Sequence, residues 1–130
     1  KGGALPKTAF PLHFCIGSYF GNGEQFYSWI HIDDLCKMFV FAIENNKLNG
    51  IFNAVAPNPV TNKSFVRNIG KTMNKKNILL PTPAFAMNLL LGEMSSIVLN
   101  GSKVSAEKIQ KAGFQFEYEH LKTALAEIYA

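Results

Sequence analysis

Two glycines separated by one residue, Gly21 and Gly23, form the first pattern in the sequence that could bind a ligand. A dinucleotide-binding loop requires a third glycine three residues after the second, where a helix packs against its strand. That position holds Phe26, and no helix is predicted to begin there. The lysine that follows a P-loop is missing as well. The pair therefore predicts a turn with positive φ angles rather than a nucleotide-binding loop.

Ser28, His31 and Asp33 have the residue types of a catalytic triad. A nucleophile and its base must meet through their side chains. On a strand, residues three apart face opposite sides, so Ser28 and His31 are not expected to meet. His31 is interpreted first as a packed histidine at a strand end. The alternative is a residue lining a ligand cleft, because the carboxyl ends of parallel strands border such clefts.

Tyr118 and Lys122 have the Tyr-x-x-x-Lys spacing of reductase active sites. On a helix the two side chains would share one face, and the ammonium group could lower the pKa of the phenol. One such pair arises easily by chance in a chain with this many lysines. No catalytic residue is predicted from it.

The composition is that of a single globular domain of 130 residues. Hydrophobic residues make up 48% and charged residues only 17%, which argues against disorder. The net charge of +4 comes from scattered lysines, with Lys75 and Lys76 the only adjacent pair. We therefore expect solvated faces and no nucleic-acid partner. No apolar stretch has the length of a membrane span, so no membrane association is expected.

The two cysteines, Cys15 and Cys36, lie in apolar surroundings without a CxxC pattern. This usage predicts buried thiols in a reducing compartment and a cytoplasmic location. Together with His13 and His31 they show no recognisable metal-ligand spacing, so no metal site is predicted.

A strand, a helix and a second strand are predicted in the first half, over 27–32, 34–45 and 51–55. The helix has apolar residues at the i, i+3, i+4 spacing, and Asp33 and Asp34 are expected at its capped start. Such a βαβ unit favours a parallel sheet, and the fold class is therefore α/β. Outside this unit, a short helix and an apolar turn are expected within 2–20. The second half is expected to be mainly helical, with helices near 61–73, 83–91, 93–99, 103–112 and 120–129, a short apolar segment at 78–80 and a short strand at 114–116.

Three segments resemble the extended short-chain dehydrogenases/reductases, the group that contains nucleotide-sugar epimerases. They are Ser-Trp-Ile-His-Ile-Asp-Asp-Leu at 28–35, Ile-Phe-Asn-Ala-Val-Ala-Pro-Asn-Pro at 51–59, and Gly-Ser-Lys-Val at 101–104 followed by Ala-Gly-Phe at 112–114. The chain is most similar to an NAD-dependent epimerase/dehydratase branch often labelled "epimerase family". That branch ends in a small helical C-terminal domain.

The resemblance implies that this is the C-terminal portion of a longer protein. Residues 1–80 would hold the last βαβ unit of a Rossmann-type parallel sheet, and residues 81–130 the helical C-terminal domain. In that group the Gly-rich loop and the catalytic Tyr-x-x-x-Lys lie upstream of such a segment. NAD or NADP is therefore expected in the whole protein, while the chain alone is expected to bind no cofactor and to be inactive.

The same resemblance places substrate-binding residues on the glycine loop and the segment after it. These are Gly21, Gly23, Gln25, Tyr27, Trp29 and His31, with Asn58 and Pro59 added because they follow the next predicted strand. The implied substrate is a small molecule, with a nucleotide sugar as one candidate. Related epimerases commonly carry an arginine where this chain has Tyr27, and the sole arginine, Arg67, lies on another predicted helix. This departure favours a flatter, less charged ligand.

A second hypothesis is a non-catalytic interaction or oligomerisation module. The predicted strands would lack neighbours without an upstream lobe, which leaves an exposed sheet edge. A homodimer formed through that edge is therefore expected.

Overall fold

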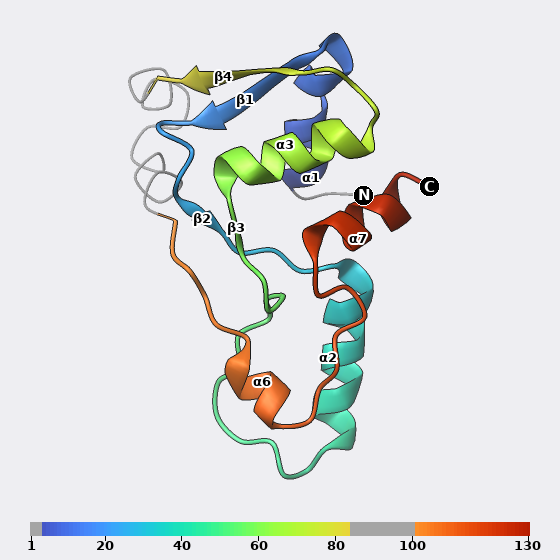
Figure 1. Ribbon diagram of the computed structural model, residues 1–130. Helices are drawn as coiled ribbons and strands as arrows, with labels where there is room; N and C mark the ends of the chain where they lie inside the picture. The colour runs from blue at the N-terminus through green and yellow to red at the C-terminus, as the bar shows by residue number, and fades with distance from the viewer. Residues whose placement is uncertain (1–3, 84–100) are drawn as a thin grey trace.

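The computed structural model describes residues 4–83 and 101–130 and has an α/β architecture (Figure 1). In chain order its elements are α1 (Ala4–Ala9), the 3-10 turn η1 (Pro11–Phe14), β1 (Ile16–Phe20), β2 (Phe26–Tyr27), α2 (Ile32–Glu44), β3 (Val60–Thr61), α3 (Asn62–Thr72), β4 (Ile78–Thr82), α6 (Glu107–Lys111) and α7 (Leu121–Ile128). The predicted fold class is confirmed.

β1 and β4 form a parallel pair, with Ile16 opposite Ile78 and Phe20 opposite Thr82. α3 lies in the crossover between them and packs against one face of β1 (Figure 1). Close packing requires a glycine at position 17, where an added Cβ would lie 2.5 Å from Cδ2 of Leu79. The sequence had predicted an apolar turn rather than β1, because Gly17 interrupts the apolar run on which a strand prediction depends.

The two strands predicted at 27–32 and 51–55 differ from the structure. Strand β2 covers only Phe26–Tyr27 and pairs antiparallel with β3. Residues 51–55 form no strand with any described residue, and Ile51 is 87% exposed. One backbone hydrogen bond joins the two regions, from N of Ala56 to O of Trp29 at 2.7 Å. A strand is defined by its neighbour, and the described chain places none beside residues 51–55.

The predicted helices agree better with the structure. α2 begins two residues before the predicted start, because His31 caps it and accepts a hydrogen bond from N of Asp33. α3 begins where predicted, with Thr61 Oγ1 accepting from N of Ser64 at 3.3 Å. α6 and α7 fall within the predicted ranges 103–112 and 120–129. The helices expected at 83–91 and 93–99 lie almost wholly outside the described residues.

Two buried clusters hold the elements together. The first, which we call the α3 cluster, comprises Ala9, Leu12, Phe65, Val66, Ile69, Leu121 and Leu125. The second, the α2 cluster, comprises Met38, Ala106, Ile109, Phe114 and Phe116. The strand predicted at 114–116 is not formed, and its two phenylalanines pack edge-on at 4.9 Å within the α2 cluster. Through α7 the C-terminal end of the chain is part of the core around α3.

Both cysteines are exposed, which corrects the expectation of buried thiols. Cys15 ends η1 with a left-handed backbone, at φ 62°. Cys36 lies on the side of α2 that also carries the exposed Phe39, Val40 and Ile43. Among the described residues, no helix combines the length and hydrophobicity needed to cross a membrane.

Candidate functional site

The glycine loop follows the carboxyl end of β1 and is fixed against the start of α3. Gly21 and Gly23 have φ angles of 55° and 75°, which confirms the predicted turn with positive φ. N of Gly23 donates to O of Phe20 at 2.8 Å, and O of Gly23 accepts from N of Lys63 at 3.0 Å. An added Cβ on Gly23 would lie 2.7 Å from Cβ of Lys63. The loop is therefore closed and rigidly placed.

Gln25 and Tyr27 continue this loop into the core. Nε2 of Gln25 donates to O of Phe20 at 3.0 Å, and O of Gln25 accepts from N of Asn62 at 2.9 Å. Tyr27 packs on Phe65, with ring centroids 4.8 Å apart, and this burial raises the pKa of its phenol. Both side chains are thus engaged within the fold.

Trp29 and Asn58 meet at the surface. Nε1 of Trp29 donates to the backbone O of Asn58 at 2.9 Å. Nδ2 of Asn58 in turn donates to the backbone O of Glu119 at 3.0 Å. Pro59 follows directly and is half-buried. The contact between Trp29 and Asn58 brings together two residues that were predicted from separate segments of the sequence.

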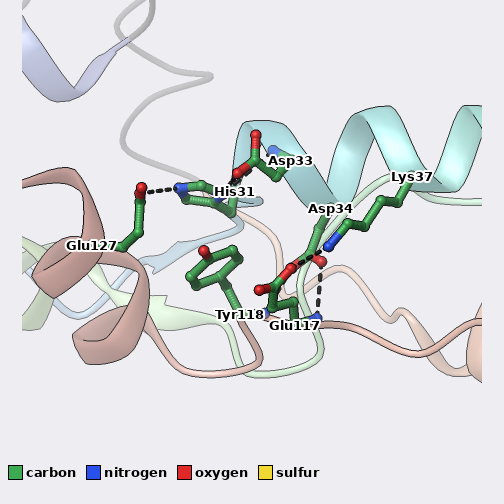
Figure 2. A network of polar contacts seen from close by, with 7 residues as sticks. All are labelled: His31, Asp33, Asp34, Lys37, Glu117, Tyr118 and Glu127. Atoms are coloured by element: carbon green, nitrogen blue, oxygen red, sulfur yellow. Dashed lines mark hydrogen bonds and ion pairs between the residues drawn. The ribbon is translucent and has the colours of Figure 1, made fainter.

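His31 is buried, with only 4% of its surface exposed, and lies among residues from three segments (Figure 2). Its Nε2 lies 3.1 Å from Oε2 of Glu127, and its Nδ1 accepts from N of Asp33 at 3.3 Å. These contacts match the tautomer that carries its proton on Nε2, a proton placement inferred from the partners. The ring of Tyr118 packs at 4.0 Å between centroids. His31 is thus packed within the fold, and its place in a ligand cleft stays a prediction.

Asp34 is fully buried. The sequence predicts for it only a place at the capped start of α2. Its Oδ1 accepts from N of Glu117 and its Oδ2 from N of Tyr118, each at 2.9 Å (Figure 2). Beside it, Lys37 and Glu117 form an ion pair. The side-chain hydrogen bond within this pair raises the pKa of Lys37. The sequence gives no local signal for this role, because the partners of Asp34 lie 83 and 84 residues away.

The structure assembles neither of the two catalytic patterns in the sequence, the Ser28–His31–Asp33 triad and the Tyr118–Lys122 pair. Oγ of Ser28 donates to O of Ser102 at 3.2 Å and does not contact His31. Tyr118 precedes α7 while Lys122 lies on it, so the two do not share one helix. Burial, followed by the charge of Glu117, raises the pKa of Tyr118, the opposite of activation. No group of three or more potential metal ligands occurs in the described ranges.

The structure thus divides seven of the eight predicted site residues into two groups. Gly21, Gly23 and Gln25 lie at the carboxyl end of β1, and Trp29, His31, Asn58 and Pro59 lie toward the C-terminal segment. Tyr27 lies between them in the core. None lines the apolar cavity of about 190 Å³ beside α2, which is formed by Leu35, Met38, Phe39, Ala42, Leu48, Phe52, Ala54 and Ile109.

Comparison with known proteins gives these groups a family context. Residues 17–54 match the NAD dependent epimerase/dehydratase family, and residues 82–128 match a domain of unknown function, DUF1731. An epimerase family protein of Staphylococcus aureus is 42% identical, and the YfhF epimerase family protein of Bacillus subtilis is 38% identical, each over 98% of this chain. The chain thus combines an epimerase-family segment with a DUF1731 region, and these relatives are epimerase family proteins. It spans 42% of the length of these curated relatives.

Solved epimerase-family structures show the same fold. The human epimerase family protein SDR39U1 (isoform 2), crystallised with NADPH, superimposes with a TM-score of 0.91 at 32% identity. The match covers 99% of this chain and 44% of the human one. A nucleoside-diphosphate sugar epimerase from Corynebacterium glutamicum gives a TM-score of 0.66 at 30% identity, over 96% of this chain and 22% of the other. The epimerase match contains Gly21 through Asp34, and the DUF1731 match contains Tyr118 and Glu127.

Proposed function

We propose that this chain is the C-terminal, substrate-side part of an NAD(P)-dependent epimerase or reductase. The observation that carries the proposal is the likeness over 99% of the chain to a human epimerase family protein crystallised with NADPH. The chain spans less than half of its relatives, which supports a cofactor site built mainly from residues outside it. In the proposed whole protein, residues 1–80 complete the cofactor-binding domain and residues 81–130 form the C-terminal domain.

The proposed substrate is a small molecule that contacts the surface around Trp29 and the glycine loop. A nucleotide sugar is the class to test first, because one structural relative is a nucleoside-diphosphate sugar epimerase. Tyr27, which stands where related epimerases commonly carry an arginine, packs on Phe65. The sole arginine of the chain, Arg67, is exposed on α3. Lys63 and Lys103 instead flank the glycine loop, over the rings of Tyr19 and Phe26, and could attract an anionic group.

The chain alone is proposed to be inactive and to work in the cytoplasm as part of the whole protein. Its two free thiols support a reducing compartment. A fluorescence titration of the 130-residue chain with NADPH and NADH tests the cofactor claim. No binding up to millimolar concentration is expected. Saturable micromolar binding would show that the cofactor site lies within this chain, and the proposed division of labour would be wrong.

A second candidate function is an interaction or oligomerisation module. The observation in its favour is the apolar side of α2, where Ile32, Phe39, Val40 and Ile43 are between 52% and 78% exposed. The two-stranded pair of β1 and β4 also has edges that no described strand covers, and a homodimer could form through one of them. Light scattering over a range of concentrations tests this function. A monomer at high concentration would rule out self-association of the chain.

A further inference from the structure

The C-terminal segment 117–127 contacts the candidate site at three separate points. Its first two residues donate to Asp34, its third accepts from Asn58, and Glu127 on α7 contacts His31. The partners belong to the segments that carry the predicted substrate-binding residues. The segment itself belongs to the part of the chain that matches a domain of unknown function.

Asp34 fixes where the segment begins. Its carboxylate is fully buried in the first turn of α2, and each oxygen accepts one backbone N–H, from Glu117 and Tyr118. Two parallel hydrogen bonds to one rigid group set both the position and the direction of the backbone. Hydrogen bonds to a charged acceptor are also stronger than those between neutral groups. The chain therefore leaves Tyr118 in a defined direction, toward Asn58.

Asn58 connects this segment to the indole of Trp29 through two hydrogen bonds. The backbone O of Glu119 holds the amide of Asn58, and the backbone O of Asn58 holds Nε1 of Trp29. Both Asn58 and Glu119 are exposed, so water competes for each of these groups. Apart from the indole itself, the side-chain amide of Asn58 is the part of these two hydrogen bonds that a substitution can remove without altering the backbone.

His31 is held by the same segment from two sides. Tyr118 packs on its ring, and Nε2 is hydrogen-bonded to the carboxylate of Glu127 (Figure 2). Nδ1 accepts a hydrogen bond from N of Asp33. Both ring nitrogens thus have partners within the fold. His31 joins α7 to the start of α2, and the more exposed Trp29 remains the group of the pair that is open to a ligand.

We propose that segment 117–127 positions Trp29 for substrate binding, with His31, Asn58, Asp34 and Glu127 as positioning residues. This role rests on the proposed function, because it treats Trp29 as a substrate contact. It also gives the terminal part of the DUF1731 region a task, which is to hold the substrate-side loop in place. None of these residues is proposed to react.

The test compares two asparagines in the full chain, Asn58→Ala and Asn53→Ala. Both are exposed, and each donates through Nδ2 to a distant backbone carbonyl, Asn58 to Glu119 and Asn53 to Ser105 at 3.1 Å. Trp29 is the sole tryptophan, so one indole N–H signal in the NMR spectrum reports on it. Asn58→Ala should move this signal upfield and speed its exchange with water, while Asn53→Ala should leave it unchanged.

An unchanged indole signal in Asn58→Ala, or an equal change in Asn53→Ala, would overturn the proposal. If Asn58→Ala does not fold, Asn58→Asp keeps the shape of the side chain without its N–H donor and should give the same shift. Glu127→Ala should move the ring signals of His31, and Glu127→Gln, which keeps an acceptor oxygen, should restore them. These signals require neither cofactor nor substrate, so a failed NADPH or substrate titration does not bear on them.

Discussion

His31 and Glu127 lie 96 residues apart in the sequence, and their side chains are joined by a hydrogen bond of 3.1 Å between Nε2 and Oε2. The histidine caps α2, and the glutamate lies near the end of α7. This contact connects the region that matches the epimerase family to the region that matches DUF1731. Loss of this contact is therefore expected to destabilise both regions.

Glu127→Ala should lower the free energy of unfolding by about 1–2 kcal/mol, because the buried Nε2 of His31 loses its partner. Glu127→Gln should recover most of this loss. Urea unfolding followed by circular dichroism measures both values. Glu44→Ala, at an exposed position on α2, serves as the control and should change stability by about 0.5 kcal/mol or less. Equal effects of Glu127→Ala and Glu44→Ala would contradict the importance of the contact.

The adjacent Asp33 and Asp34 should respond very differently to substitution by alanine. Asp34→Ala leaves two backbone N–H groups without an acceptor, at about 1–3 kcal/mol each, so a loss of at least about 2 kcal/mol is expected. Asp33 is exposed and mainly complements the helix dipole, so Asp33→Ala should cost about 1 kcal/mol or less. Chemical denaturation of the two variants side by side measures the difference. A larger effect at Asp33 would show that the assignment of the buried carboxylate is wrong.

Asp34 also shows why part of the site could not be predicted from the sequence. The spacing of apolar residues predicted α2 and α3, because helix periodicity is a local property of the chain. The two carboxylates of 33 and 34 look alike in the sequence, and only the fold buries one of them against Glu117 and Tyr118. The strand predicted at 51–55 failed for a related reason, since strand formation depends on a neighbour. β1 was missed because Gly17, which its packing requires, weakens the apolar pattern.

Stability should fall at alkaline pH because of the tyrosines. Burial raises the pKa of Tyr27 in the folded state, so above a pH of about 10 the unfolded chain loses this proton while the folded chain keeps it. The unfolded state then binds fewer protons, and the free energy of unfolding decreases as the pH rises. Tyr118 and Tyr129, whose pKa values are also raised by burial, add to this effect.

Tyr27→Phe should reduce the alkaline loss of stability and leave stability at neutral pH nearly unchanged, because the ring still packs on Phe65. Urea unfolding between neutral pH and pH 11 or so, in the range where tyrosine ionises, measures this difference. Tyr129→Phe provides the comparison at a more exposed position. If Tyr27→Phe shows the same alkaline profile as the unchanged chain, the burial of this phenol does not govern the profile.

The two thiols distinguish between the proposed functions through their reactivity. Cys15 and Cys36 are both exposed, so a thiol reagent should modify both in the folded, dilute protein. Cys36 lies on the apolar side of α2 beside Phe39 and Val40. If copies of the chain associate through this side, raising the protein concentration should slow modification of Cys36 and leave Cys15 unaffected. The single variants Cys15→Ser and Cys36→Ser assign each rate. Rates that do not depend on concentration, together with a monomer by light scattering, would exclude association through α2 and leave the substrate-side role as the function to pursue.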